Sequence, residues 1–423
     1  MSSSDGAAIP LPFVAPADWS TKPLRAACTL IADGDWVELK DQGGQDFRLL
    51  QISNVGRGDF VETGKYRWIT EETFNRLRCT EIKVGDVLVA RMPEPTGRCW
   101  YVRELPWRAV TAVDVAIVRT DESELDGRFL SYYLNSPQCL GAVASLTTGT
   151  TRLRIRRADI GRLTVPLPPL SEQRAIAEVL GALDDKIEAN RRVADLATKV
   201  ALAQATSALG HFGGTLTDME LIADITKGVS YRSDDLTPGD GWLVGLKCVG
   251  RDGSFEPGGL KPFSGPAKPG QVVDDGDVLV AQTDLTQKAE VIGRPIRVER
   301  LGLVGRFAAS LDFAIVRPRP PLTRELLFGL LSQRLFREHA LGFCNGTTVL
   351  HMSSRAVSSY QVAVPDAEQV RQLTNIMKPL LESSAVARRE SSVLERVRDA
   401  LLPKLLSGEV QVRDTEAIAQ GAV

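Results

Sequence analysis

The sequence predicts an α+β protein that arose by tandem duplication. We expect two β-rich globular parts, each followed by a long α-helix, with the two helices pairing as an antiparallel coiled coil of pseudo-twofold symmetry. Three observations predict this fold. Landmarks of the first half return in the same order in the second half, short alternating apolar runs fill the globular parts, and long helical patterns begin after proline-marked boundaries. The length of 423 residues also favours more than one domain.

The duplication is visible in five landmarks. GDVLVAR at Gly85 returns as GDVLVAQ at Gly276, 191 residues later, and DVAIVRT at Asp114 returns as DFAIVRP at Asp312. The Gly-Thr-Thr of TTGTTRLRIRR returns in CNGTTVLHMSS, a proline before the long helix returns, and an Arg-Arg pair inside the helix returns, each 197 residues later. A shift that drifts by only a few residues over five landmarks indicates one duplication.

The composition is that of an ordinary globular protein. Lysine and arginine number 51 against 53 aspartate and glutamate, so no overall basic field indicates nucleic acid, and such a partner must be met by local patches. The six cysteines form no CxxC pair and no histidine lies at metal-ligand spacing, which favours reduced thiols and argues against zinc. The N-terminal stretch lacks the regions of a signal peptide, and no run reaches membrane-spanning length, so we expect a cytoplasmic protein.

Each globular part is predicted from strand and turn signals. Runs such as DVLVA, VDVAIV and RLTVPLP lie between Gly and Pro turns and predict short strands. The stretches from Ser123 to Pro137 and from Thr323 to Ala340 predict amphipathic helices. The expected boundaries are 1–19 for a flexible N-terminal extension, 20–168 for the first globular part, 169–211 for the first long helix, 212–365 for the second globular part, 366–412 for the second long helix and 413–423 for a tail.

The first long helix begins after PLPPL. Ser171 is the expected N-cap, Glu172 suits the positive first turn, and Gly210 is a natural stop. About 40 residues at 1.5 Å per residue give a rod of about 60 Å. Spacings of four and three predict a coiled-coil seam in which Asn190 would fix the register. That seam consists of Ile176, Leu180, Leu183, Ile187, Asn190, Ala194, Ala197, Ala201, Gln204 and Ala208.

The second long helix follows the same plan with one departure. Pro379 predicts a kink or a late start. The alternative interpretation, that each rod is a single core helix, does not explain why both recur at a proline-marked boundary. We therefore expect the rods to pair and to act as a spacer. The apolar residues of the second rod are Leu373, Ile376, Met377, Leu380, Leu394, Val397 and Leu401.

Several motifs resemble those of a known family, the specificity (S) subunits of Type I restriction-modification enzymes. They are PLPPLSEQRAIAEVL from Pro166, GDVLVAR with its approach KYRWITEETFNRLRCTEIKV, and the closing LLPKLLSGEVQV from Leu401. The resemblance implies a non-catalytic subunit with two target recognition domains, each reading one half of a bipartite, asymmetric site in double-stranded DNA. It also implies that the helices set the gap and dock two methyltransferase subunits, which restriction and translocase subunits join. S-adenosylmethionine, ATP and Mg²⁺ would belong to those partners, and this chain would hold no cofactor.

A dimer-like DNA reader must place its reading units roughly 34 Å or more apart, and a rod of about 60 Å is long enough. In the first domain, Arg152, Arg154 and Arg156 are expected on one face of a strand, with Leu153 and Ile155 facing the core. Such arginines suit phosphates and guanine, although a solvated edge strand protected by charge is the alternative. The candidate DNA-contacting residues are Arg91, Arg98, Thr150, Thr151, Arg152, Arg154, Arg156, Arg157, Gln282, Thr283, Gln287, Lys288, Thr347, Thr348, His351, Ser353 and Arg355, with Arg57 and Lys65 as weaker candidates.

The sequence shows none of the catalytic motifs we sought. It has no GxxxxGK[ST] loop, GxGxxG, HExxH or aromatic-flanked Pro-Pro motif, so we expect neither catalytic residues nor a metal site. Glu38-Leu39-Lys40, with Asp18 and Asp35 upstream, could be read as a nuclease motif, but it has no counterpart in the second repeat. Two rival functions remain open at this point: a specificity subunit for a fused methyltransferase-nuclease polypeptide, and an assembly scaffold that does not bind DNA.

Overall fold

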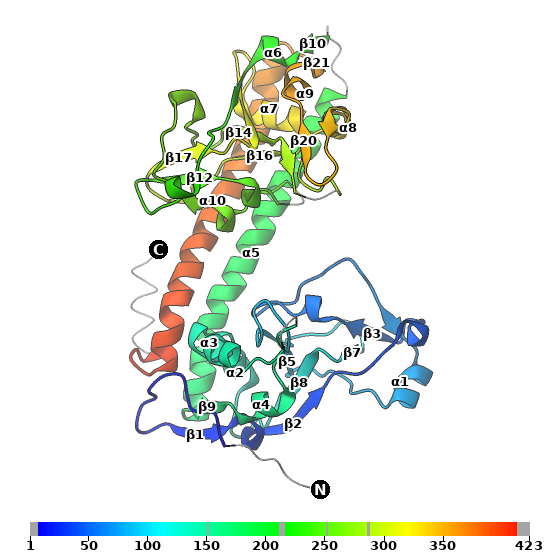
Figure 1. Cartoon of the computed structure of the whole chain (residues 1–423), viewed down its shortest axis with the longest axis vertical. Coiled ribbons are helices and arrows are strands. Elements are labelled where there is room, and N and C mark those ends of the chain that lie inside the picture. Colours follow the sequence, from blue (N-terminus) through cyan, green and yellow to red (C-terminus); the bar gives the residue numbers. More distant parts are fainter. Residues whose placement is uncertain (1–6, 150–151, 211–215, 251–252, 286–287, 413–423) are drawn as a thin grey trace. The chain divides into compact units, whose positions relative to one another are not determined.

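The computed structural model describes residues 7–149, 152–210, 216–250, 253–285 and 288–412 (Figure 1). The chain divides into two compact units, one formed by Met1–Asp185 with Glu395–Val423 and the other by Lys186–Leu394. Each unit contains one globular repeat together with part of each long helix. The C-terminal end of the last helix, from Glu395, therefore belongs to the first unit.

The first unit contains a mixed set of short elements. Its strands are β1 (Ser20–Pro23), β2 (Cys28–Asp33), β3 (Phe47–Leu50), β4 (Trp68–Ile69), β5 (Val87–Ala90), β6 (Cys99–Tyr101), β7 (Ala109–Thr111), β8 (Val115–Thr120) and β9 (Thr164–Leu167). Its short helices are α1 (Glu71–Leu77), α2 (Gly127–Asn135), α3 (Pro137–Ser145) and α4 (Arg157–Arg162), with 3-10 turns η1 (Leu24–Ala27), η2 (Leu39–Asp41) and η3 (Ile52–Asn54).

The second unit repeats this plan. Its strands are β10 (Leu216–Asp218), β11 (Ala223–Lys227), β12 (Gly241–Val244), β13 (Lys261–Pro262), β14 (Val278–Ala281), β15 (Thr283–Asp284), β16 (Pro295–Arg297), β17 (Arg306–Ala309), β18 (Phe313–Pro318), β19 (Cys344–Asn345), β20 (Leu350–Met352) and β21 (Gln361–Ala363). Its helices are α6 (Met219–Ile222), α7 (Arg324–Leu331), α8 (Arg334–Leu341) and α9 (Arg355–Ser358), with 3-10 turns η4 (Ser233–Asp235), η5 (Leu246–Cys248), η6 (Pro257–Gly259) and η7 (Pro269–Gln271).

Three sheets of each unit have the same topology, which confirms the predicted duplication, and the second unit adds the sheet β15-β20-β19. The order β2-β8-β5-β6 of the first unit matches β11-β18-β14-β16 of the second, and every pair in both sheets is antiparallel. The order β4-β3-β7 matches β13-β12-β17, and each has one parallel pair. In both units an antiparallel ribbon, β1-β9 or β10-β21, closes the repeat just before the long helix.

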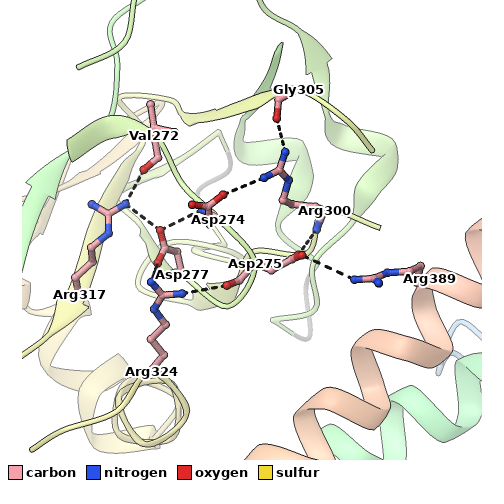
Figure 2. A network of polar contacts seen from close by, with 9 residues as sticks. All are labelled: Val272, Asp274, Asp275, Asp277, Arg300, Gly305, Arg317, Arg324 and Arg389. Carbon is pink, nitrogen blue, oxygen red and sulfur yellow. Dashed lines mark hydrogen bonds and ion pairs between the residues drawn. The ribbon is translucent and has the colours of Figure 1, made fainter. Parts of the chain in front are cut away.

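The GDVLVA motif recurs because its aspartate anchors the core sheet. The side chain of Asp86 is buried and accepts from Nε and Nη2 of Arg119 at 2.7 and 2.8 Å. In the second unit Asp277 accepts from Nη2 of Arg317 at 2.9 Å, and Figure 2 shows it between Arg317 and Arg324. A buried carboxylate requires such charged partners. The preceding Gly85 has a φ of 96°, which favours glycine.

The two long helices are α5 (Leu170–Leu209) and α10 (Ala367–Leu406), 40 residues each. Helix α5 begins one residue before Ser171, and the carbonyl of Pro169 accepts from the N–H of Glu172 at 2.8 Å, so the expected Ser171 N-cap is wrong. Glu172 lies in the first turn and Gly210 follows the last residue, as predicted.

Helix α10 continues through the exposed Pro379, so the late start is wrong. Proline has no backbone N–H to donate, so the carbonyl four residues earlier loses its partner in the helix. On an exposed face of the helix that carbonyl can bind water instead.

The helices pair antiparallel, as predicted (Figure 1). In the second unit Asn190 contacts Glu390 and Thr198 contacts Ser384, at 2.8 and 2.9 Å, so rising numbers on α5 meet falling numbers on α10. The predicted seam residues that are buried are Ile176, Leu180, Ile187, Asn190, Ala194, Ala201, Leu373 and Met377. Those that are half-buried are Leu183, Ala197, Ala208, Leu380, Leu394, Val397 and Leu401.

Two seam positions differ from the prediction. Gln204 is exposed and Ala205 is buried in its place, and Ile376 is 45% exposed while Leu381 is buried. Ala205 follows Gln204, and Leu381 follows the half-buried Leu380, so the buried side of each helix lies one residue further along than predicted there, because 3.6 residues per turn drift against a strict seven-residue repeat.

The ends of the described chain complete the first unit. The N–H of Ile9 donates to the carbonyl of Arg162 at 2.8 Å, and Trp19 is buried, so residues 7–19 are not the flexible extension we expected. Leu405 and Leu406 are buried in the core of the first unit. The expected tail 413–423 and residues 1–6 lie outside the described residues.

The predicted short helices are present with one change. Helix α2 lies within the stretch from Ser123 to Pro137, and the side chain of Asp126 caps it by accepting from the N–H of Phe129. The stretch from Thr323 to Ala340 forms two helices, α7 and α8. In the described part of the chain no helix combines the length and apolarity needed to cross a membrane. All six cysteines are free thiols.

Candidate nucleic-acid interface

Two candidate segments meet at the same place in both units. The N–H of Ile155 donates to the carbonyl of Arg91 at 3.0 Å, and the N–H of Met352 donates to the carbonyl of Gln282 at 2.8 Å. The loop after the GDVLVA strand therefore lies beside the segment that follows Gly-Thr-Thr, although they are far apart in sequence. The two candidate segments therefore lie side by side in each unit.

Glycine is required at the turn of this segment. Gly149 has a φ of 115°, and a Cβ there would lie 2.5 Å from the carbonyl oxygen of Arg152. Gly346 has a φ of 126°, and a Cβ there would lie 2.0 Å from the carbonyl oxygen of Val349. A side chain would collide with backbone in both places. The repeated glycine of the Gly-Thr-Thr landmark is thus explained by local geometry.

The expected arginine strand of the first domain is wrong. Residues 152–156 form only an isolated bridge between Thr148 and Arg154, and α4 begins at Arg157. Ile155 faces the core as predicted, but Leu153 is 45% exposed. Arg154 is held by its bridge to Thr148 and its ion pair with Asp114, and α4 begins three residues later, which limits the extended segment.

Arg91 and Arg98 point inward. Nε of Arg91 donates to the carbonyl of Ile155 at 3.1 Å, and its guanidinium pairs with Asp33. Arg98 donates to four backbone carbonyls, of which that of Val55 lies at 2.8 Å. Burial lowers the pKa of both guanidinium groups from its usual value. These two side chains therefore hold neighbouring loops together. The residue type alone did not distinguish this structural role from DNA contact.

The other first-domain arginines differ in their freedom. Arg154 pairs with Asp114 at 2.9 Å and Arg157 with Asp33 at 3.4 Å. Arg156 pairs with Asp159 at 2.7 Å, yet its side chain is 67% exposed. Arg152 is exposed, and no acidic partner for it is found among the described residues. Arg152, Arg156 and Arg157 are therefore the accessible cations of this segment, and Arg152 is the one without an acidic partner among the described residues.

In the second domain the candidates divide between surface and interior. Thr283 of β15 lies opposite His351 of β20 in an antiparallel pair, which joins the two predicted segments. Gln282 and Thr283 are buried, at 7% and 8% exposure, and so are poorly placed to read bases. Exposed candidates are Lys288, Thr347, Thr348, His351 and Arg355, and Ser353 is half-buried. Thr150, Thr151 and Gln287 lie outside the described residues.

A further basic loop joins β3 and β4 in the first unit. Lys65, Tyr66 and Arg67 are all exposed there, and only Lys65 was among our weaker candidates. The guanidinium of Arg48 lies 4.8 Å from the ring of Tyr66 and pairs with Glu62 at 2.8 Å. These two contacts tie the loop to β3. A basic-aromatic-basic triplet in GKYRW was the signal that could have identified Arg67.

The ELK triplet of the first domain has no free carboxylate. Glu38 pairs with Lys40 at 2.7 Å, and the pKa of the Glu38 carboxyl is lowered by this contact. Across the ranges that the structure describes, no group of three His, Cys, Asp or Glu side chains is placed to hold a metal ion.

Known proteins resemble the chain over most of its length. The family model described as the Type I restriction modification DNA specificity domain matches residues 34–196. The type I restriction enzyme MjaIX specificity subunit of Methanocaldococcus jannaschii is 22% identical over 437 residues, covering 94% of this chain and 95% of the relative. The MjaVIII specificity subunit of the same organism is 21% identical over 324 residues, covering 69% of this chain and 72% of the relative.

A solved structure has the same fold. The crystal structure of a Type-I restriction-modification system S subunit from M. genitalium matches with a TM-score of 0.56 at 15% identity, and the match covers 94% of this chain and 99% of that one. The match extends over both repeats and both long helices, so the likeness is one of the whole architecture.

Proposed function

We propose, from the premise that this chain belongs to the specificity subunits of type I restriction-modification systems, that it reads a bipartite, asymmetric site in double-stranded DNA. The relatives are named for specificity and not for catalysis. One observation carries the proposal. Two domains of one topology present different exposed side chains at equivalent segments, Arg152 and Arg156 in the first and His351 and Arg355 in the second. Two unlike readers on one scaffold suit a two-part, asymmetric sequence.

The reading surface of the first domain would be mainly electrostatic. Arg152 and Arg156, with Lys65 and Arg67 of the β3–β4 loop, offer exposed cations for phosphates. The second domain offers an imidazole and hydroxyl groups in its equivalent segment, which suit hydrogen bonds to base edges better than charge neutralisation. The two half-sites should therefore differ in the salt dependence of binding.

The helix pair would serve as spacer and as docking surface. In the second unit Val193, Leu196 and Val200 of α5 are 47%, 60% and 45% exposed, and their spacing of three and four places them on one stripe. On α10, Val386 and Val393 are 63% and 37% exposed and lie two turns apart. Exposed apolar stripes on paired helices fit apolar faces of partner helices. We assign these stripes to the methyltransferase subunits, which restriction and translocase subunits would join.

The remaining chemistry would belong to the partners. S-adenosylmethionine, ATP and Mg²⁺ are proposed to bind the methyltransferase and restriction subunits, and this chain to bind no cofactor. Since the substrate is DNA, the complex would act in the cytoplasm, which fits the free thiols of the chain.

A selection from pooled random duplexes tests the proposal. The chain, alone and with the methyltransferase encoded beside it, is incubated with the pool, and bound DNA is sequenced. A two-part motif with a fixed gap supports the proposal. If no sequence is enriched either by the chain alone or with the methyltransferase, the result favours the assembly scaffold instead. Leu196→Glu with Val200→Glu should abolish methyltransferase binding, and Leu153→Glu, another exposed apolar residue, is the matched control that should not.

A further inference from the structure

The first unit contains a cavity of about 60 Å³ where its globular part meets the two long helices. It is lined by arginines from separate segments: Arg57 after η3, Arg103 after β6, Arg128 of α2 and Arg398 of α10. The acidic side chains in the lining are Asp184 of α5 and Asp399 of α10. We call this site the arginine cavity.

Two of the four guanidinium groups are neutralised within the protein. Arg398 donates to Asp184 and to Asp399, each at 2.8 Å. Arg103 pairs with Asp185, which follows Asp184 on α5. The hydroxyl of Tyr132 also donates to Asp184, at 2.5 Å. The acids around the cavity are therefore already used.

Arg128 has unused donors. Its Nε and Nη2 are buried and make no hydrogen bond, and Nη2 lies 3.6 Å from Asp185 Oδ2, too far for one. The guanidinium lies across Gly181 of α5, where a Cβ would come within 1.8 Å of Nη2. Glycine is disfavoured inside a helix, so its presence here is explained by the approach of this side chain. The chain makes room for Arg128 without giving its donors an acceptor.

Arg57 is the other arginine whose charge is not fully balanced. Its Nε and Nη2 donate to the carbonyl of Asn135 at 3.1 and 2.8 Å, and this acceptor carries no charge. Among the described residues Arg57 has no acidic partner. One guanidinium without a counter-charge and a second one whose nearest carboxylate, Asp185, lies 3.6 Å away and also pairs with Arg103 thus line one cavity.

The second repeat does not reproduce this arrangement. The N-caps Asp126 and Thr323 are equivalent, and each accepts from the N–H three residues later. Arg128 lies two residues after its cap, and the equivalent residue after Thr323 is Glu325. The reversal from arginine to glutamate shows that the cavity is not a general requirement of the fold.

We propose that the arginine cavity binds a small oxyanion of the phosphate class, held by Arg57 and Arg128. Guanidinium forks match tetrahedral oxyanions, and charge-assisted hydrogen bonds would supply the missing acceptors. A water-sized group needs about 10–15 Å³ of such a cavity, so about 60 Å³ has room for roughly four of them. A phosphate ion has four oxygens. The anion could come from solution or be a phosphodiester of bound DNA. The site does not depend on the proposed DNA-reading function.

Binding is tested with inorganic phosphate on the full chain, by calorimetry and thermal melting, against sodium chloride at equal ionic strength. Phosphate should bind saturably and raise the melting temperature, whereas chloride should not. Arg57→Ala, at an exposed position that does not endanger folding, should weaken phosphate binding at least about tenfold, since charge-assisted hydrogen bonds are strong. Arg128→Lys should retain part of the binding and Arg128→Ala none. Arg67→Ala, an exposed cation of the same unit, is the matched control.

The salt dependence of DNA binding identifies the source of the anion. If Arg57→Ala lowers the slope of log affinity against log salt by about one, the occupant is a DNA phosphodiester. If the slope is unchanged while phosphate binding is lost, the occupant is a free anion. Equal effects of phosphate and chloride, or equal phosphate binding by wild type and the Arg57→Ala/Arg128→Ala variant, would overturn the proposal.

Discussion

Nδ2 of Asn190 donates to Oε2 of Glu390 at 2.8 Å, so a buried amide in the seam of α5 is bonded to a carboxylate of α10. Lys186 also approaches that carboxylate, at 3.3 Å. A polar side chain that is buried in an apolar seam destabilises the helix pair unless it forms a hydrogen bond across the seam. The pair therefore selects one antiparallel register from those that an alanine-rich seam would otherwise allow.

Asn190→Leu should raise the free energy of unfolding by about 1 kcal/mol and loosen the register, because leucine adds apolar burial without a fixed partner. The register is measured by disulfide trapping between cysteines at Thr198 and Ser384, whose hydroxyl groups lie 2.9 Å apart. This pair should cross-link cleanly in an otherwise wild-type chain. In the Asn190→Leu background, cysteines one turn out of register should also cross-link. Clean trapping of the native pair alone in that background would deny the role of Asn190.

Asp86→Ala should destabilise the first unit by about 3 kcal/mol, because it leaves the guanidinium of Arg119 without its buried counter-ion. Hydrogen exchange of the amides in β5 and β8 reports the change. Asp277→Ala should do the same in the second unit, with the effect seen in β14 and β18. Glu122→Ala, at an exposed carboxylate of the same unit, is the control and should have little effect. A uniformly small effect of both motif variants would show that GDVLVA is retained for another reason.

Burial raises the pKa of Glu299 to about 7 from 4.5, with nearby Asp275 and Glu256 acting in the same direction and Arg388 and Arg297 opposing it. Between these two pH values the folded chain holds a proton that the unfolded chain releases. Stability of the second unit should therefore fall as pH rises from about 4.5 to about 7, and Glu299→Gln should flatten this dependence. Exchange of the amides of β14 and β16 against pH measures it.

Glu220→Gln provides the control for that experiment, because this carboxylate is exposed in the same unit and is not among the charges that shift the pKa of Glu299. It should leave the pH dependence of the second unit nearly unchanged. An identical slope in wild type and Glu299→Gln would mean that another group titrates in this range.

Arg152→Ala should weaken DNA binding and lower the slope of log affinity against log salt by about one, since its exposed guanidinium is free to neutralise one phosphate. Arg98→Ala should instead destabilise the first unit, because its donors hold backbone carbonyls. Filter binding over a salt series and hydrogen exchange measure the two effects. A lowered slope for Arg98→Ala with unchanged stability would reverse these assignments. The pair Arg154→Ala with Arg156→Ala should lie between, because both side chains have internal acids.

The duplicated architecture could be predicted because it leaves long-range traces in the sequence. GDVLVA repeats since its aspartate must bind the arginine of the neighbouring strand, and Gly149 and Gly346 repeat since no other residue fits their turns. The heptad spacing predicted a coiled-coil seam, and the recurrence of the helix in both repeats predicted the antiparallel pairing. These features depend on local geometry or on regular spacing, which a single sequence displays.

The details of the interface could not be predicted in the same way. Arg91, Arg98 and Arg152 look alike in sequence, yet the first two bind backbone inside the fold and the third is exposed. The difference depends on carbonyls and carboxylates from distant segments, such as Asp33 beside Arg91. Residues 1–19 were expected to be a flexible extension, whereas the apolar side chains of residues 7–19 cover a surface that exists only after the first unit has folded.

The most direct test of the central claim is long-read mapping of methylated adenines in the host genome, with and without this gene. A DNA-reading specificity subunit with two unlike domains predicts a two-part, asymmetric motif with a fixed gap that disappears on deletion. Restoring the gene with Arg152→Ala should reduce methylation of that motif without changing the gap. A methylation pattern that is identical in the presence and absence of the gene would contradict the account.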